Sequence, residues 1–395
     1  MPSIKNKNRL WKIHSQEWRE PASVVGLNQS LGQVDRNLLS CKTFGPWWAI
    51  LHRRKIRLII SREYEHLLLC LGVSAAKPEV SYMRIPHPSG IAVDRLKKKI
   101  FVASTRNPNQ IFEFNNTLGL IKRSDLKKFN TTSNGLRNRL IPRKSVFLPG
   151  SCYIHDLSFI GGKLYANAVG HNAVVEINDD GGFSYVWWPK CVERNKKVLT
   201  DANYLQLNSI SGGASIRDCF FTASGERVSR KRPGDLDFPV DQRGVLFSAE
   251  TRQPVCRGLT RPHSARKYWG KIWLNNSGYG ELGFADRGFF CVVSRLPGWT
   301  RGLCFSGGVA FVGISRVIPK FHRYAPGLDV KKSRTGVYAV DLKNGKILAG
   351  IEWPNGNQIF AVECVPADFT DGFVYDDKPG NHHGQDKHIF YAFNL

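Results

Sequence analysis

The sequence lacks a long hydrophobic run. Its most apolar stretches, residues 67–73 and 302–314, fall well short of the roughly 20 residues that a membrane-spanning helix needs. The basic N-terminus is not followed by an apolar segment of about 7–15 residues, so the pattern of a secretory signal is absent. We therefore expect a protein without a membrane span that stays in the cytoplasm.

Familiar catalytic and nucleotide-binding motifs are missing as well. No G-x-S-x-G, H-E-x-x-H, Walker or Cys-x-x-Cys motif occurs. The sequence therefore lacks the commonest motifs of serine nucleophiles, zinc sites and phosphate-binding loops. Residues 278–283 match G-x-G-x-x-G, but they lie between two expected strands, so no helix N-terminus is expected there to hold a pyrophosphate. No zinc-finger spacing, basic heptad region or RNP-like aromatic run occurs, so nucleic acid is not an expected partner.

Acidic residues are scarce. The 395 residues include 57 Lys or Arg but only 32 Asp or Glu, which gives a formal net charge of +25. The cations form clusters, for example at residues 53–55, 97–99 and 230–232, mostly between expected strands. Two interpretations stay open: the clusters are solvated loop faces, or their summed positive field attracts a polyanionic partner such as an acidic glycan.

The nine cysteines form no disulfide pattern. Their number is odd, they are widely spread, and several, such as Cys70 and Cys304, lie within apolar strand-like runs. This distribution is typical of buried free thiols in a reducing compartment, which agrees with a cytoplasmic location.

Helical periodicity is rare throughout the chain. From Arg57 onward, short β-branched and aromatic runs alternate with Gly, Asn, Asp and Pro, a pattern that indicates strands and turns. Residues 1–55 show no clear period, and residues 45–48 are expected to interrupt any helix there. We therefore divide the chain into an irregular N-terminal extension, residues 1–55, and an all-β domain, residues 56–395.

Six strand openings of similar pattern recur along the all-β domain. Neighbouring openings are 38–66 residues apart, and their reference positions are Ser89, His155, Asn208, His263, Arg301 and Phe360. Four-stranded repeats of about 40–50 residues are typical of propeller blades, and longer gaps indicate loop insertions. The expected fold is a six-bladed β-propeller, closed by strands near residues 57–72 and after residue 373. Ordinary hairpins of a sandwich or two-domain protein are the alternative.

In such a propeller, the start of each innermost strand faces the central axis. One face should therefore collect a polar funnel beside an aromatic wall from Phe360. The candidate ligand-binding residues are Ser89, Arg106, His155, Asn208, His263, Ser264 and Arg301. The first hypothesis is a binding propeller whose funnel recognises an anionic glycan, metabolite or protein partner.

Two further hypotheses remain open. The funnel could serve a metal-assisted hydrolase or lactonase, with His155, Asn208 and His263 as ligands of a divalent metal ion and Asp156 as the catalytic base. Alternatively, the N-terminal extension docks a protein partner through aromatic anchors of the kind that interfaces favour. These anchors would be Trp11, Trp18, Trp47 and Trp48.

Seven short segments along the chain form an ordered set of motifs. They are residues 103–111, 154–157, 207–208, 261–264, 276–282, 296–303 and 310–315. Through them, residues from about 85 to 366 resemble the bacterial family named domain of unknown function 4915, and the resemblance implies a propeller fold. Gln206 and Asn276 depart from the family pattern, which has His and Asp at these positions. The resemblance carries no activity with it, because a fold does not imply a function.

Overall fold

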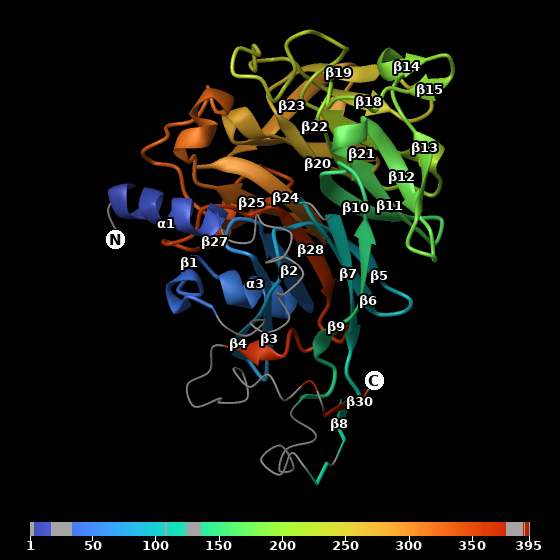
Figure 1. Cartoon of the computed structure of the whole chain (residues 1–395). Coiled ribbons are helices and arrows are strands. Elements are labelled where there is room, and N and C mark those ends of the chain that lie inside the picture. Colours follow the sequence, from blue (N-terminus) through green and yellow to red (C-terminus); the bar gives the residue numbers. More distant parts are fainter. Residues whose placement is uncertain are drawn as a thin grey trace.

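The computed structural model describes residues 4–16, 34–106, 109–121, 123–124, 136–376, 390 and 392–394. In this part of the chain, six antiparallel sheets are arranged in a ring, with the innermost strand of each sheet contacting those of its two neighbours. The expected all-β, six-bladed β-propeller is thereby confirmed (Figure 1). No helix among the described residues is long and apolar enough to cross a membrane.

Five blades are built from strands that follow one another in the chain. From the innermost strand outward, blade 1 contains β5 (Pro88–Asp94), β6 (Lys99–Ser104), β7 (Asn109–Asn116) and β9 (Leu140–Leu148). Blade 2 contains β10 (Ile154–Ile160), β11 (Lys163–Ala168), β12 (Ala173–Ile177) and β13 (Phe183–Trp187). Blade 3 contains β16 (Leu207–Ile210), β17 (Phe220–Ala223), β18 (Gly244–Ser248) and β19 (Pro254–Leu259). Blade 4 contains β20 (Pro262–Tyr268), β21 (Lys271–Asn276), β22 (Glu281–Asp286) and β23 (Phe289–Arg295), and blade 5 contains β24 (Trp299–Ser306), β25 (Val309–Ser315), β26 (Gly336–Asp341) and β27 (Ile347–Glu352).

Blade 6 joins segments from the two ends of the chain. Its innermost strand is β28 (Ala361–Pro366), and the next strands are β2 (Ile56–Arg62), β3 (Leu67–Ser74) and β4 (Lys77–Arg84). In Figure 1, β28 lies beside β2, and the two strands pair antiparallel.

The closing strand differs from the expected one. The ring closes through β28, which ends at Pro366, and not through a strand after residue 373. The later strand β29 (Tyr375–Asp376) instead pairs with β4 at the outer edge of blade 6. Closure through β28 completes the ring, in which the inner edge of each sheet is short and lies against the innermost strands of its neighbours.

The N-terminal extension is more regular than expected. It contains α1 (Ile4–Gln16), β1 (Lys42–Phe44), which extends blade 5 by pairing with β27, and α3 (Trp47–Arg53). The expectation that residues 45–48 interrupt a helix is wrong, because α3 begins directly after Pro46. A proline at this boundary costs no intrahelical hydrogen bond, since the first N–H groups of a helix have no partner within it.

The tryptophans of the extension do not form one exposed row of anchors. Trp47 is 1% exposed and packs edge-on against Phe311, so it belongs to the core and cannot anchor a partner. Trp48 is half-buried against the same core, and Trp11 packs against Tyr64. Trp18 lies outside the described residues.

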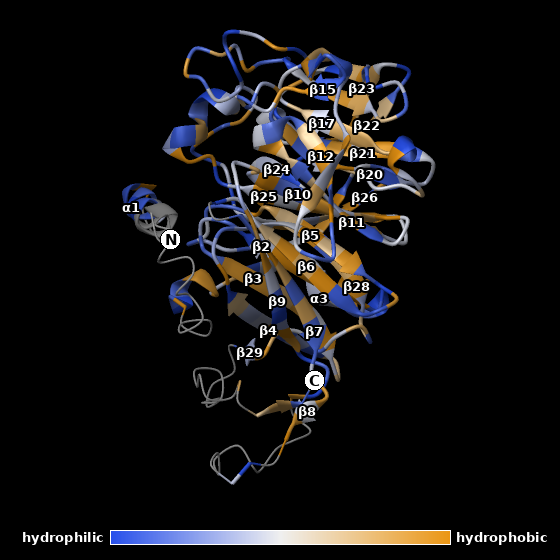
Figure 2. Cartoon of the chain, turned by 45° about the vertical axis from the view of Figure 1, so that its right-hand side comes forward, coloured by the Kyte–Doolittle hydropathy of each residue, from blue (hydrophilic) through white to orange (hydrophobic). Residues whose placement is uncertain are grey.

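Short elements complete the described structure. They are the 3-10 helices η2 (Arg36–Leu38), η5 (Val169–His171), η6 (Lys190–Val192), η7 (Ile216–Asp218), η8 (Ser277–Tyr279) and η9 (Pro319–Tyr324), and the pairs β14 (Glu193–Arg194) with β15 (Lys197–Val198) and β8 (Gly119–Leu120) with β30 (Phe393–Asn394). Figure 2 shows that the blade strands are largely hydrophobic, whereas the loops between them are largely hydrophilic. All nine cysteines are free thiols, and a cytoplasmic location stays a prediction.

The innermost strands share one irregularity. In blades 1 to 5, the pairing of the innermost strand with its neighbour shifts register near the start of the strand, so the innermost strand carries one extra residue. The shifts fall at residues 88–91, 154–157, 207–209, 263–266 and 300–303. A bulge of this kind re-aims side chains that strict strand alternation would turn the other way.

Polar side chains of the two innermost strands of each blade hold neighbouring blades together. Ser61 Oγ donates to the Ser89 carbonyl (2.6 Å), Ser89 Oγ to the Ile154 carbonyl (2.8 Å), Asn167 Nδ2 to the Leu207 carbonyl (2.9 Å), Asn208 Nδ2 to the Pro262 carbonyl (3.0 Å) and Ser315 Oγ to the Ile359 carbonyl (3.1 Å), while Ser264 Oγ accepts from the Gly302 N–H (2.8 Å). These bonds cross all six boundaries between blades. They satisfy backbone groups that the bulges remove from the regular ladders.

One arginine ties three blades that are not neighbours. The guanidinium of Arg266 in blade 4 forms ion pairs with Asp156 in blade 2 (3.0 Å) and with Glu363 in blade 6 (2.9 Å). All three side chains are mostly buried, and burial raises the pKa of Glu363. The cluster therefore lies where the innermost strands of alternate blades meet.

Replacing Arg266 should destabilise the ring. The variant Arg266→Met leaves two buried carboxylates without their cation, so the free energy of unfolding should fall by about 3–5 kcal/mol in urea titrations. The matched control is Arg257→Met, which breaks the exposed ion pair with Glu226 and should cost no more than about 1 kcal/mol. Equal losses in the two variants would contradict a central role for Arg266.

Candidate functional site

A cavity of about 250 Å³ lies at the face of the ring where the innermost strands begin. Three of the residues expected in the funnel line it: His155 from β10, His263 from β20 and Arg301 from β24. The imidazole rings of His155 and His263 lie nearly parallel, with centroids 6.5 Å apart. The Phe360 ring packs edge-on against His155, which places the expected aromatic wall beside the cavity.

A set of residues with an unusual backbone conformation precedes the innermost strands. His87, Tyr153, Gln206 and Arg261 directly precede β5, β10, β16 and β20, and each has a left-handed backbone conformation, with φ between 40° and 52°. For a residue with a side chain, this conformation costs roughly 1–2 kcal/mol. Tyr153, Gln206 and Arg261 line the cavity, and such strained positions are frequent at functional sites.

Hydrogen bonds hold both histidines in place. His155 bonds through Nδ1 to Asn208 Oδ1 (3.2 Å), and His263 bonds through Nδ1 to the Arg261 carbonyl (2.8 Å) and to Ser277 Oγ (2.9 Å). Burial, together with the charge of Arg301, lowers the pKa of both imidazoles well below its usual range. Both side chains are therefore neutral at physiological pH.

Arg301 is the least compensated charge at this site. Its side chain is buried, and its guanidinium lies over the Phe360 ring, 3.2 Å from the centroid. Within the described residues Arg301 forms no ion pair, and its Nη2 atom has no hydrogen-bond partner. Burial lowers the pKa of Arg301 to about 10, so the side chain still carries its charge at neutral pH.

The outer part of the cavity is aromatic. Trp299, Phe321 and Tyr324 pack against one another, with ring centroids 5.5–6.2 Å apart, and Tyr64 stacks on Phe321. Phe321 and Tyr324 come from η9, a turn in the long connection between β25 and β26. The cavity thus combines cationic side chains with an aromatic wall.

Four predicted ligand-binding residues lie outside the lining of this cavity: Ser89, Ser264, Asn208 and Arg106. Ser89 and Ser264 form the bonds between blades described above. Asn208 uses its amide nitrogen on Ser224 and the Pro262 carbonyl and its oxygen on His155. These residues support the site from behind, and direct contact with a ligand stays a prediction without a supporting contact.

Arg106 and Asp156 are engaged elsewhere. Arg106 forms an ion pair with Glu63 (3.3 Å) and lies over the ring of Tyr153, so it borders the cavity through these two residues. Asp156 pairs with Arg266 and also accepts from the N–H groups of Leu157 and Ile210. A role for Asp156 as a base stays a prediction, and its bound oxygens give it little support.

The predicted metal ligands fit a cation poorly. The oxygen of Asn208 is already used by His155, and the buried charge of Arg301 repels a divalent ion near the two imidazoles. Across the described ranges, no group of three or more His, Cys, Asp or Glu side chains is placed to hold a metal ion.

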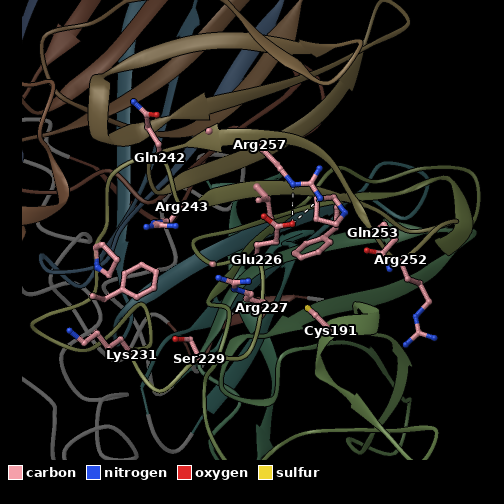
Figure 3. A pocket seen from close by; sticks show the side chains of 17 residues that line it. Cys191, Glu226, Arg227, Ser229, Lys231, Gln242, Arg243, Arg252, Gln253 and Arg257 are labelled. Atoms are coloured by element: carbon pink, nitrogen blue, oxygen red, sulfur yellow. Dashed lines mark hydrogen bonds and ion pairs between the residues drawn. The ribbon is translucent and has the colours of Figure 1, made fainter.

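A larger cavity of about 560 Å³ lies at the outer part of blade 3 (Figure 3). Most of its cations are already paired: Arg257 with Glu226, Lys231 with Asp237 and Arg252 with Glu193. Its arginines are largely exposed, in contrast to Arg301. Screening by solvent makes such a surface a weaker anion site than the smaller central cavity.

Comparison with known proteins agrees with the motifs in the sequence. A family model described as Domain of unknown function (DUF4915) matches residues 45–370. The chain belongs to the DUF4915 family. The match begins ahead of blade 6 and includes α3, so this helix of the extension is part of the family region. A search of curated proteins found no match.

Solved structures similar to this DUF4915 chain share little sequence with it. A chain of a nidogen/laminin complex has 9% sequence identity and a TM-score of 0.51. The alignment covers 79% of the DUF4915 chain and 99% of the chain from the complex. A gluconolactonase from Xanthomonas campestris has 14% identity and a TM-score of 0.42, over 68% and 77% of the two chains. Virginiamycin B lyase from Staphylococcus aureus has 11% identity and a TM-score of 0.38, over 79% and 99%. At these identities, the likeness concerns the fold alone.

Gln206 and Asn276, the two residues that depart from the DUF4915 pattern, lie in different parts of the structure. Gln206 lines the cavity and accepts a hydrogen bond from Arg261. Asn276 lies in blade 4, where it accepts from the Thr260 N–H and donates to Glu281, so it is part of the scaffold. Only the first departure changes the chemistry of the cavity.

The neutral state of the histidines can be measured directly. In an NMR titration of the imidazole Cε1–H signals, His155 and His263 should show no protonation step near pH 6.5. In Arg301→Gln the pKa of both should rise, because a nearby positive charge that opposes protonation is removed. A normal titration of His155 in the unchanged protein would contradict the described burial.

Proposed function

We propose that this DUF4915 protein is a binding propeller that recognises a small anionic ligand in the central cavity. The observation that carries the proposal is the buried guanidinium of Arg301, which has no ion pair among the described residues and an unbonded Nη2 atom. A buried charge without a partner costs several kcal/mol. A carboxylate or phosphate bound beside Arg301 would remove that cost.

Arg261 and Arg106 add to the positive potential around Arg301. Arg261 is buried and lies over the Tyr324 ring, 3.9 Å from the centroid, and burial lowers its pKa to about 10. The carboxylate of Glu63 also faces this region and raises the pKa of Arg301, which partly offsets the effect of burial, but Glu63 forms its ion pair with Arg106 and accepts a hydrogen bond from Thr105. The charge left uncompensated inside the cavity is therefore positive, which favours an anion.

The size of the cavity limits the ligand. A volume of about 250 Å³ lies just below the range of roughly 300–1,000 Å³ for pockets that hold drug-sized molecules. An extended glycan would therefore enter only with its terminal unit. The basic loops outside the cavity can attract a longer anionic chain without binding it specifically.

The other hypotheses find less support in the geometry. A metal-assisted hydrolase would need Asp156 and Asn208, whose polar atoms are already bonded within the protein. Docking of a protein partner through the N-terminal extension loses one anchor, because Trp47 is buried. We place the protein in the cytoplasm, because its nine free thiols suit a reducing compartment.

Anion binding should depend on Arg301. In calorimetric titrations with a panel of small carboxylates and phosphates, the unchanged protein should bind at least one anion, and Arg301→Gln should weaken that binding about 10- to 150-fold, the loss expected for a hydrogen bond to a charged group. Arg257→Gln, which removes the same charge beside the cavity of blade 3, should leave the affinity unchanged. Binding that survives Arg301→Gln would overturn the proposal.

The same variant separates binding from folding. Without added anion, Arg301→Gln should unfold at no lower urea concentration than the unchanged protein, because it removes an uncompensated buried charge. A clear loss of stability would instead assign Arg301 to the scaffold.

Metal content tests the hydrolase hypothesis. Protein purified without chelator should contain far less than one equivalent of transition metal by mass spectrometry, because the two imidazoles gain no third ligand among the described His, Cys, Asp and Glu side chains and lie beside the positive charge of Arg301. One equivalent of metal that is lost in His155→Ala, with the fold intact by circular dichroism, would favour the hydrolase.

A further inference from the structure

The hydrogen bonds of His155 and His263 determine which ring nitrogen carries the proton. Asn208 donates through Nδ2 to the Pro262 carbonyl, which can only accept, so its oxygen faces His155 Nδ1 and accepts from it. His263 Nδ1 faces the Arg261 carbonyl, which also only accepts. In both neutral imidazoles Nδ1 therefore carries the hydrogen, and Nε2 presents a lone pair.

These lone pairs are left for a ligand. The Nε2 atom of His155 is buried and has no hydrogen-bond partner among the described residues, and no bond from His263 Nε2 is found within the same part of the chain. Both rings line the central cavity. Since an unpartnered buried acceptor costs about 1–3 kcal/mol, the lone pair of His155 Nε2 favours a ligand that supplies an N–H or O–H donor, and His263 Nε2 offers a second acceptor at the same cavity.

The aromatic wall narrows the chemistry further. The Trp299 ring lies 6.2 Å from the ring of His263 and continues into Phe321 and Tyr324. A ligand at the imidazoles therefore has an apolar surface on one side and Arg301 as a cation. A molecule that suits all three features has hydroxyl donors, an anionic group and a ring whose C–H face can pack against aromatic side chains.

We infer that the ligand is an anionic monosaccharide, an inference that rests on the proposed function. Its carboxylate or phosphate binds Arg301, and its hydroxyl groups donate to Nε2 of His155 and His263. The histidines then act as specificity residues: they reject anions of similar size that lack hydroxyl groups, because such anions leave both lone pairs unsatisfied.

Calorimetric titration with matched ligands tests this inference. The charged sugars to be tested are glucuronate, galacturonate and glucose 6-phosphate. The controls are glucose, which has no charge, and cyclohexanecarboxylate, which has the ring and the charge but no hydroxyl groups. We expect at least one charged sugar to bind at least 10-fold more tightly than both glucose and cyclohexanecarboxylate. The uronic acids and the sugar phosphate distinguish the two sources of the anionic group.

The variant His155→Phe keeps an aromatic ring but removes the acceptor. It should weaken binding of the charged sugar roughly 2- to 12-fold, the effect of one neutral hydrogen bond, and leave cyclohexanecarboxylate unaffected. Equal affinity of the unchanged protein for charged sugars and cyclohexanecarboxylate would overturn the inference but leave the proposed anion site intact. If none of the anions bound, both would fail.

A measurement on the unchanged protein does not depend on the variant folding. In ¹⁵N NMR spectra of the imidazoles, Nδ1 of His155 should give the signal of a protonated nitrogen, and Nε2 that of an unprotonated one. Addition of the bound sugar should shift the Nε2 signal toward that of a hydrogen-bonded nitrogen. A protonated Nε2 would overturn the inference.

Discussion

The hydrogen bonding between neighbouring blades at the centre of the ring is the constraint on which the rest of the structure depends. Each innermost strand of blades 1 to 5 carries a bulge, which takes backbone groups out of the ladder inside a tightly packed region. Short polar side chains, such as Ser89 and Ser264, supply the missing partners across the blade boundary. At the bulge of blade 5, Gly302 has a φ of +83° and approaches the Val362 nitrogen so closely that a side chain would not fit. The bulges that join the blades therefore also lie beside the residues of the site.

The bulges also explain why polar side chains gather in the cavity. An extra residue in the strand breaks the alternation of faces, so that one polar side chain of a pair is used in the scaffold while its neighbour faces the axis. His263 lines the cavity, and the adjacent Ser264 bonds to blade 5. His155 lines the cavity, and the adjacent Asp156 pairs with Arg266. The hydrogen bonds that close the ring therefore also fix the positions of the side chains that line the cavity.

Sequence patterns identified the ring and part of the site, each for a physical reason. The polar openings of the repeat mark the bulges, so His155, His263 and Arg301 could be predicted from their place in it. The scaffold roles of Ser89, Asn208 and Ser264 could not, because a strand pattern does not say on which side of a bulge a side chain lies. Arg261 was within reach, since it directly precedes the Pro262-His263 motif, but its left-handed conformation leaves no sign in the residue type. The aromatic wall from η9 comes from a long connection, and such segments carry no periodic signal.

The central claim is that an uncompensated buried arginine in the middle of the ring holds the anionic group of a ligand. A crystal structure of the full chain grown with the tightest-binding anion of the panel tests this claim most directly. The account predicts that the carboxylate or phosphate contacts the guanidinium of Arg301, within hydrogen-bond distance of Nη2. An anion found only among the exposed arginines of blade 3, with the central cavity filled by water alone, would contradict it.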